Sequence, residues 1–138
     1  MGKIKVDELE ERVSNSGITV NSTLKGAVLQ DYAEVDQDIS SSATLAIDLA
    51  NGNTGSVTLG TNVTDIDFTN VPTSGVSTFT LIVTQDGTGS RTASFGSVWD
   101  FIGGTAPTLT TTASAVDRLD YIVRSSTKIH AVVTLAYS

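Results

Sequence analysis

Two pairs of carboxylates have a type and spacing that could do chemistry. Asp65 and Asp67 lie two residues apart, and so do Asp36 and Asp38. Paired carboxylates can exchange protons with a substrate or hold Ca²⁺ through their oxygens. Asp65 and Asp67 alternate with apolar residues, which predicts that they lie on the solvated face of a strand. The Asp36–Asp38 segment lacks the glycine and the distal glutamate of an EF-hand loop, so it predicts no specific calcium site.

The segment Asp86-Gly87-Thr88-Gly89 combines a carboxylate with two glycines, as phosphate loops and aspartic proteases do. A phosphate loop leads into a helix N-terminus and carries a lysine followed by serine or threonine. Here a strand pattern follows the turn and no such lysine is present. The sequence also lacks the second similar motif that a protease dyad needs. We therefore expect this segment to be the tip of a hairpin between Phe79–Val83 and Arg91–Phe95.

His130 is the only histidine, and the sequence contains no cysteine. A zinc site or a nucleophilic catalyst needs further ligands or partners, which a lone histidine does not have. His130 lies between Ile129 and Ala131 in an apolar segment, which predicts a partly exposed strand residue. The sequence contains no Gly-x-Ser-x-Gly motif. It therefore predicts no catalytic residue, no metal site and no cofactor, and the protein is not expected to be an enzyme.

Trp99 is the only tryptophan, with Phe95 and Phe101 close by in sequence. An exposed aromatic ring could stack on a sugar, since binding sites are commonly lined with aromatic side chains. No further aromatic residues cluster around it in the sequence. The favoured interpretation is that Trp99 closes one end of a β-sheet core, with ligand stacking as the alternative.

Composition favours an all-β domain and argues against two classes of partner. The 138 residues include 21 threonines and 16 serines, and only 17% are charged. Threonine, valine and isoleucine suit half-buried strands. The net charge of −7 argues against nucleic-acid binding and against docking on anionic membranes. No apolar run approaches the length needed to cross a bilayer, so membrane insertion is not expected.

Alternating apolar residues predict strands throughout residues 40–138. Ala43–Leu49 alternates with a period of two, and the turn signal Asn51–Gly55 predicts that Ser56–Leu59 returns beside it. Leu119–Arg124 and Lys128–Ala136 are expected to pair across a short turn. Several short strands at regular spacing indicate an antiparallel β-sandwich, jelly-roll-like in arrangement.

Residues 1–39 are predicted to form a separate N-terminal arm. Asp7 with Glu10 resembles a capping box, and apolar residues recur on one helical face after it. A helix of about two turns is marginal in water unless it docks against something. The candidate docking residues are Ile4, Val6, Leu9 and Val13. The arm is therefore a candidate anchor to a neighbouring subunit, with a frayed terminus as the alternative.

Residues 63–136 combine a strand, a glycine-containing turn, an aromatic residue and a glycine-rich corner before the next strand. These are Phe79–Val83, Gln85–Gly89, Arg91-Thr92, Trp99, Gly103–Thr110 and Ala115–Asp117 leading into Leu119–Val123. In this combination the segment resembles a module of bacteriophage virion proteins, particularly tail-fibre and virion-appendage proteins.

The resemblance implies a β-sandwich that assembles with copies of itself, commonly as a homotrimer, and that acts in adhesion or assembly. The acidic N-terminal arm would attach it to the major capsid protein or another virion protein. Because 138 residues leave little room for a fibre shaft, a capsid decoration, cement or short head-fibre subunit is expected. Such a protein is made in the host cytoplasm and lies on the virion surface. A tail-fibre tip that binds a host surface glycan is the alternative.

Overall fold

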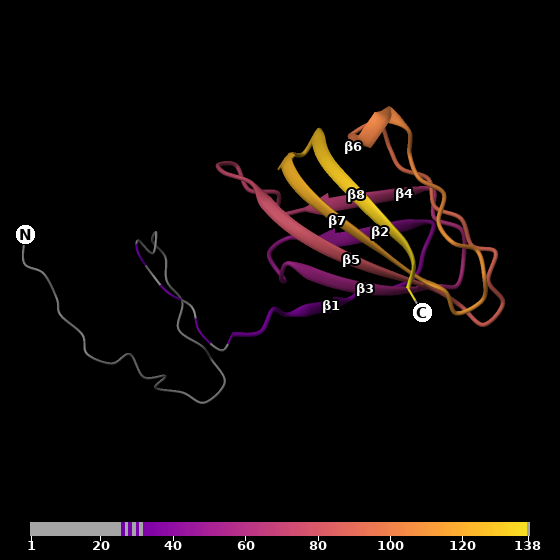
Figure 1. The fold of residues 1–138 in the computed structure, drawn as a ribbon. Helices are drawn as coiled ribbons and strands as arrows, with labels where there is room; N and C mark the ends of the chain where they lie inside the picture. The colour runs from indigo at the N-terminus through magenta and orange to yellow at the C-terminus, as the bar shows by residue number, and fades with distance from the viewer. Residues whose placement is uncertain (1–25, 27, 29, 31, 138) are drawn as a thin grey trace, which may run out of the picture. The chain divides into compact units, whose positions relative to one another are not determined.

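The computed structural model describes residues 26, 28, 30 and 32–137. Its compact β unit begins at Ala33. Within the described residues the chain forms eight strands and one short 3-10 helix (Figure 1). In chain order these are β1 (Asp36–Asp38), β2 (Thr44–Asp48), β3 (Thr54–Leu59), β4 (Asp65–Thr69), β5 (Ser77–Gln85), β6 (Trp99–Phe101), η1 (Ile102–Gly104), β7 (Val116–Ser125) and β8 (Lys128–Tyr137).

The strands form two sheets. The six-stranded sheet has the order β1-β3-β5-β7-β8-β6, and the second sheet consists of β2 and β4. Strands β1, β3 and β5 are parallel, as are β2 and β4 and also β6 and β8. The pairs β5–β7 and β7–β8 are antiparallel. The six-stranded sheet is therefore mixed.

The first five strands form a coil, because the chain passes alternately through the large sheet and the small sheet from β1 to β5 (Figure 1). Parallel neighbours cannot be joined by a tight turn and need a crossover connection. In this chain β2 connects β1 to β3, and β4 connects β3 to β5, so a strand of the second sheet takes the place usually held by a helix. Each crossover strand gains its own partner, because β2 and β4 pair along five residues.

Both sheets bury side chains in one hydrophobic cluster. Leu45 and Ile47 of β2 lie in the same cluster as Leu59 of β3 and Leu81 of β5, and all four are almost fully buried. Gly55 of β3 allows a close approach there, since a methyl group at that position would lie 2.8 Å from the Ile39 side chain. The shared cluster holds β2 and β4 against the larger sheet.

Several expectations from the sequence are confirmed. The chain is all-β in its described part, apart from η1. The period of two in Ala43–Leu49 matches β2, in which Leu45 and Ile47 are buried between exposed residues. The C-terminal pairing is also confirmed, because β7 and β8 are antiparallel across a two-residue turn.

The antiparallel, jelly-roll-like arrangement is wrong for much of the fold. The expected return of Ser56–Leu59 beside Ala43–Leu49 does not occur, since β2 and β3 belong to different sheets. The hairpin expected between Phe79–Val83 and Arg91–Phe95 is also absent. β5 pairs instead with β3 and β7, and only Ala93 of the expected second strand forms a bridge, with Val63. Alternation had identified the buried faces but not the neighbouring strands.

The β unit extends further towards the N-terminus than residue 40. Strand β1 pairs with β3, and the following residue, Ile39, is buried in the core. Its amide also donates to the Ser56 carbonyl at 2.9 Å. Residues 36–39, which the sequence assigns to the arm, therefore belong to the sheet.

The parallel pairing of β2 with β4 can be tested by a disulfide, because the chain has no cysteine of its own. Ala46 and Asp67 are register partners and both are exposed. Neighbouring strands are spaced within the Cα–Cα range that a disulfide spans. We expect Ala46→Cys combined with Asp67→Cys to oxidise to an intramolecular disulfide, measured by mass and thiol titration in denaturant.

The matched control is Ala46→Cys combined with Thr58→Cys. Thr58 is exposed on β3, in the other sheet, so this pair should keep two free thiols. Ready oxidation of the control pair, with none in the first pair, would show that β2 and β3 form the hairpin after all.

Candidate partner-binding face

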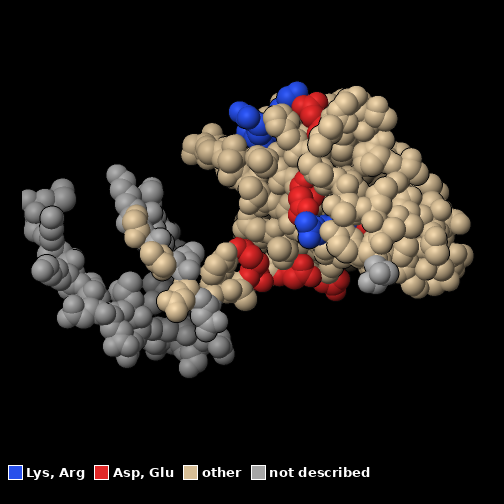
Figure 2. Space-filling model, in the orientation of Figure 1, with Lys and Arg blue, Asp and Glu red and all other residues tan. Residues whose placement is uncertain are grey.

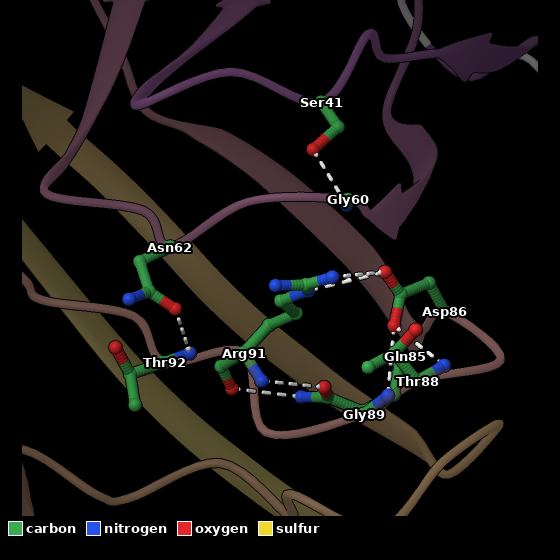
Figure 3. A network of polar contacts seen from close by, with 9 residues as sticks. All are labelled: Ser41, Gly60, Asn62, Gln85, Asp86, Thr88, Gly89, Arg91 and Thr92. Carbon is green, nitrogen blue, oxygen red and sulfur yellow. Dashed lines mark hydrogen bonds and ion pairs between the residues drawn. The ribbon is translucent and has the colours of Figure 1, made fainter.

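The Asp86–Gly89 segment is a turn closed by the carboxylate of Asp86 (Figure 3). One oxygen, Oδ1, accepts hydrogen bonds from the amides of Thr88 at 3.0 Å and Gly89 at 2.8 Å. The other, Oδ2, accepts from Arg91 Nε at 3.1 Å and Nη2 at 2.7 Å. Both carboxylate oxygens are therefore occupied by the turn itself. This arrangement supports a structural role for the motif.

Gln85 explains why the expected hairpin does not form. Its side chain is buried at 3% exposure and bonds to the backbone of Arg91, donating to the carbonyl and accepting from the amide, both at 2.9 Å (Figure 3). An amide side chain thus makes the two bonds that a neighbouring strand would make. The following residue, Thr92, donates its amide to Asn62 Oδ1 at 3.1 Å and accepts from the Val63 amide. The segment after the turn is therefore held beside Val63 and away from β5.

The remaining carboxylate pairs do not converge. Asp67 is exposed, and Asp65 accepts a hydrogen bond from the amide of Ile66, its own neighbour in β4. Asp36 accepts from the Ser56 hydroxyl at 2.8 Å, while Asp38 is exposed on the same edge strand. Among residues 32–137, no three His, Cys, Asp or Glu side chains gather as a metal site would require.

Trp99 lies inside an aromatic cluster and is 7% exposed. Its ring centroid is 5.1 Å from that of Tyr121, 5.5 Å from Phe68 and 5.4 Å from Phe95. These side chains come from β4, β6, β7 and the segment before β6, so the indole joins both sheets at one end of the core. This burial supports the closing role for Trp99, and its ring faces are covered by protein. Burial also raises the pKa of the Tyr121 phenol far above its ordinary value.

A groove of about 630 Å³ lies on the solvent side of the six-stranded sheet. Its exposed apolar side chains are Ile122 of β7 and Val132 of β8, with Ile102 of η1 at one end. These are 42%, 49% and 82% exposed. The lining also includes polar residues of β5 to β8, such as Thr78, Thr80 and His130, and the aromatic residues Phe79, Phe101 and Tyr121. The groove thus presents apolar side chains among polar ones.

Ion pairs hold the carboxylates that line the groove. Asp120 accepts from Thr80 Oγ1 at 2.8 Å and from Arg118 Nε at 2.8 Å. Asp100 lies 2.5 Å from Lys128 Nζ and 3.6 Å from His130 Nε2. The hydrogen bond from Lys128 keeps the pKa of Asp100 below its ordinary value. His130 is exposed, as expected from the sequence.

Acidic and basic side chains form separate groups on the face of the molecule that Figure 2 shows. Figure 2 shows acidic side chains gathered over β1 and basic ones near the tip of the β7–β8 hairpin. The acidic residues of β1 are Asp36 and Asp38, and the basic residues beside the hairpin turn are Arg124 and Lys128. Between these two groups Figure 2 also shows acidic and basic atoms near the middle of this face, and uncharged side chains cover most of the rest of it. Such a surface suits contact with another macromolecule.

The groove residues were not singled out from the sequence, although a signal was present. Ile122 and Val132 occupy positions that alternation assigns to the solvent side of β7 and β8. An apolar residue at a solvent-facing position is the observation that could have identified them. The docking residues predicted in the arm, Ile4, Val6, Leu9 and Val13, lie outside the described residues.

Comparisons identify no relative of the chain: no family model, no curated protein and no solved structure matches it. Within the described residues, no helix is long and apolar enough to cross a membrane.

The turn makes a specific prediction about Gly89. Its φ is +71°, and a methyl group would lie 2.6 Å from the Thr111 carbonyl oxygen and 2.7 Å from the Ala113 nitrogen. Both contacts are with backbone that cannot rotate away. We expect Gly89→Ala to lower the free energy of unfolding by roughly 1–3 kcal/mol in urea unfolding.

Gly87→Ala is the matched control, two residues away in the same turn. No atom lies within 4 Å of a methyl group there. Its free energy of unfolding should change by no more than about 0.5 kcal/mol. Equal losses at the two positions would mean that this turn is not packed as described.

The Asp86–Arg91 pair predicts a dependence on pH. The hydrogen bond from Arg91 is the main cause that lowers the pKa of Asp86, with the Gly89 and Thr88 amides adding to it. A lowered pKa means that this carboxylate stabilises the fold above the pKa of the unfolded chain. The stabilisation is lost as the pH falls through the folded-state pKa.

We therefore expect Asp86→Asn to be less stable than the wild type at neutral pH, with the difference shrinking in acid. Urea unfolding at a series of pH values measures it. Asp67→Asn is the control, because Asp67 is exposed and makes no hydrogen bond among the described residues. A difference that stays constant from neutral to acidic pH would contradict the role of the Asp86 charge.

Proposed function

We propose that this protein is a non-enzymatic structural component of a bacteriophage virion. In this proposal it is a capsid decoration, cement or short head-fibre subunit on the virion surface. It is attached to the major capsid protein or another virion protein through its N-terminal arm. It assembles as a homo-oligomer, with a homotrimer expected from the family resemblance. We also interpret the two sheets as the layers of a sandwich, since both bury one face in the same cluster.

The observation that carries the proposal is the contrast between the polar and the apolar side chains of the solvent face. Asp100 and Asp120, which line the groove, are each paired with a basic side chain of the chain itself. Exposed apolar side chains, by contrast, lie diagonally across the β7–β8 pair, at Ile122 and Val132. A surface of this kind favours binding to another macromolecule over acid–base chemistry.

The alternative function is a receptor-binding or glycan-binding tip of a tail fibre. The groove favours it, because apolar side chains ringed by hydroxyl, imidazole and carboxylate groups can contact both the faces and the hydroxyls of a sugar. Trp99 does not contribute a stacking surface to such a site, because it is buried.

Labelling of virus particles distinguishes the two functions. Antibodies raised against residues 33–138 would be bound to purified particles of the phage that encodes the chain and imaged by electron microscopy. Label distributed over the head supports a decoration or cement protein. Label confined to the tail tip supports the alternative. Particles without label, while the same antibody detects the isolated protein, would contradict both functions.

The role of the arm gives a separate prediction. Deletion of residues 1–16 should leave the described β unit folded, because that unit begins at Ala33 and has its own core. The truncated protein should no longer bind particles from which the native protein has been removed. Circular dichroism and thermal unfolding check the fold, and co-sedimentation with the particles measures attachment.

Thr58→Lys in the full chain is the control for that measurement, since Thr58 is an exposed residue of β3. It should bind as the wild type does. A truncated protein that binds equally well would show that attachment does not use the arm, and one that unfolds would show that the arm belongs to the core.

A further inference from the structure

Within the described part of the chain, strand β8 has an edge that is only partly covered by another strand. β8 runs from Lys128 to Tyr137 and pairs along its length with β7 on one side. On the other side, β6 pairs with it only from Ile129 to Ala131. No backbone hydrogen bond joins Val132–Leu135 to another described segment on that side. These four residues are called the open segment below.

The direction of the free backbone groups follows from one hydrogen bond. The Ile129 amide donates to the Val98 carbonyl at 2.8 Å, so it points away from β7. Backbone amide and carbonyl groups alternate in direction along a strand. Those of Val133, four residues after Ile129, therefore also point away from β7 and toward the open side. At the far end, the Ala136 amide is bound to the buried carboxylate of Asp117 at 2.9 Å. The open segment thus begins where the pairing with β6 ends and reaches the bulge that β8 forms opposite Asp117 of β7.

The open edge of β8 differs in charge from the opposite edge of the sheet, which is formed by β1. Two of the three residues of β1 are aspartates, so that edge repels an identical strand. Residues 131–137 have no charged side chain and no proline, which are the usual features that keep edges from pairing. Val132 and Leu135 are 49% and 45% exposed beside the open backbone. The β8 edge therefore lacks a barrier to association with its own kind.

We propose that two copies of this protein associate through their open segments, with β8 of one copy antiparallel to β8 of the other. A twofold axis makes identical strands antiparallel and gives both the same contacts. A hollow of about 170 Å³ lies beside the edge, lined by Phe101, Ile102, Thr105, Pro107 and Ala131–Val133. In the antiparallel pair, Leu135 of the second copy lies opposite this hollow and fills it.

The proposal does not depend on a virion function. It predicts an even number of copies, so the homotrimer of the proposed function is compatible with it only where two trimers pair through these edges. The number of copies is measured on the full chain by sedimentation equilibrium and by oxidation of variants with one cysteine each. Because the wild-type sequence has no cysteine, any disulfide in such a variant must join two copies through the introduced residue. We expect a wild-type dimer, or a larger even-numbered complex, at micromolar concentration. Each register of the antiparallel pair places one combination directly opposite, so at least one of Val132→Cys alone, Thr134→Cys alone and a mixture of the two should form covalent dimers on mild oxidation.

Ile122→Cys is the matched control. Ile122 is exposed on the same face but on β7, one strand away from the edge. It should cross-link at least tenfold more slowly than the faster of the edge variants. Cross-linking of Ile122→Cys at the same rate as the edge variants would indicate that copies pack face to face, which overturns the proposal.

A second variant tests the hollow without a cross-link. Leu135→Ser keeps the backbone and should weaken dimerisation at least tenfold, with thermal unfolding of the isolated chain as the check on folding. A wild-type monomer at these concentrations, or a trimer that neither edge cysteine cross-links, would also overturn edge pairing. The trimer result would leave the proposed virion role intact.

Discussion

The fold depends on one constraint, which is that parallel neighbours in a sheet must be connected through another layer. β1, β3 and β5 are parallel neighbours, so the chain leaves the large sheet after each of the first two. By passing through β2 and β4 it builds the second sheet and supplies the apolar side chains that cover the first. The segments that connect the parallel strands are therefore also the segments that complete the hydrophobic core. After β5 the chain crosses to the far edge of the large sheet as β6, and the antiparallel strands β7 and β8 then fill the space between β5 and β6.

Local patterns in the sequence predicted the elements whose partners are local. β7 and β8 are adjacent along the chain, and their two-residue turn made their pairing predictable. Alternation also located β2, because it reports which face is buried. It does not report which strand lies beside it, and so the parallel pairing of β2 with β4 was missed. Gln85 shows a further limit, because its bonds to Arg91 depend on a loop conformation that no spacing rule describes.

The candidate site could be predicted only in part. Exposed apolar residues on β7 and β8 had a signal in the alternation, but their grouping into a groove required the sheet order, which places β8 between β7 and β6. The sequence did indicate that Asp86 is structural, and its four hydrogen bonds agree with this. The docking residues of the arm stay a prediction. Together these features direct attention to surfaces and edges, where binding depends on shape and on backbone pairing.

The coil has a consequence for the order in which the protein folds. β1 to β4 emerge first during synthesis, yet none of them can pair with the strand that directly follows it. β1 must wait for β3 and β2 for β4, and among the described strands only β7 and β8 form a local hairpin. Contacts between distant residues form slowly because the intervening chain must be closed into a loop. We therefore expect the β7–β8 hairpin, whose strands are adjacent in sequence, to form faster than the parallel pairs β1–β3 and β2–β4, although its strands are the last to be made.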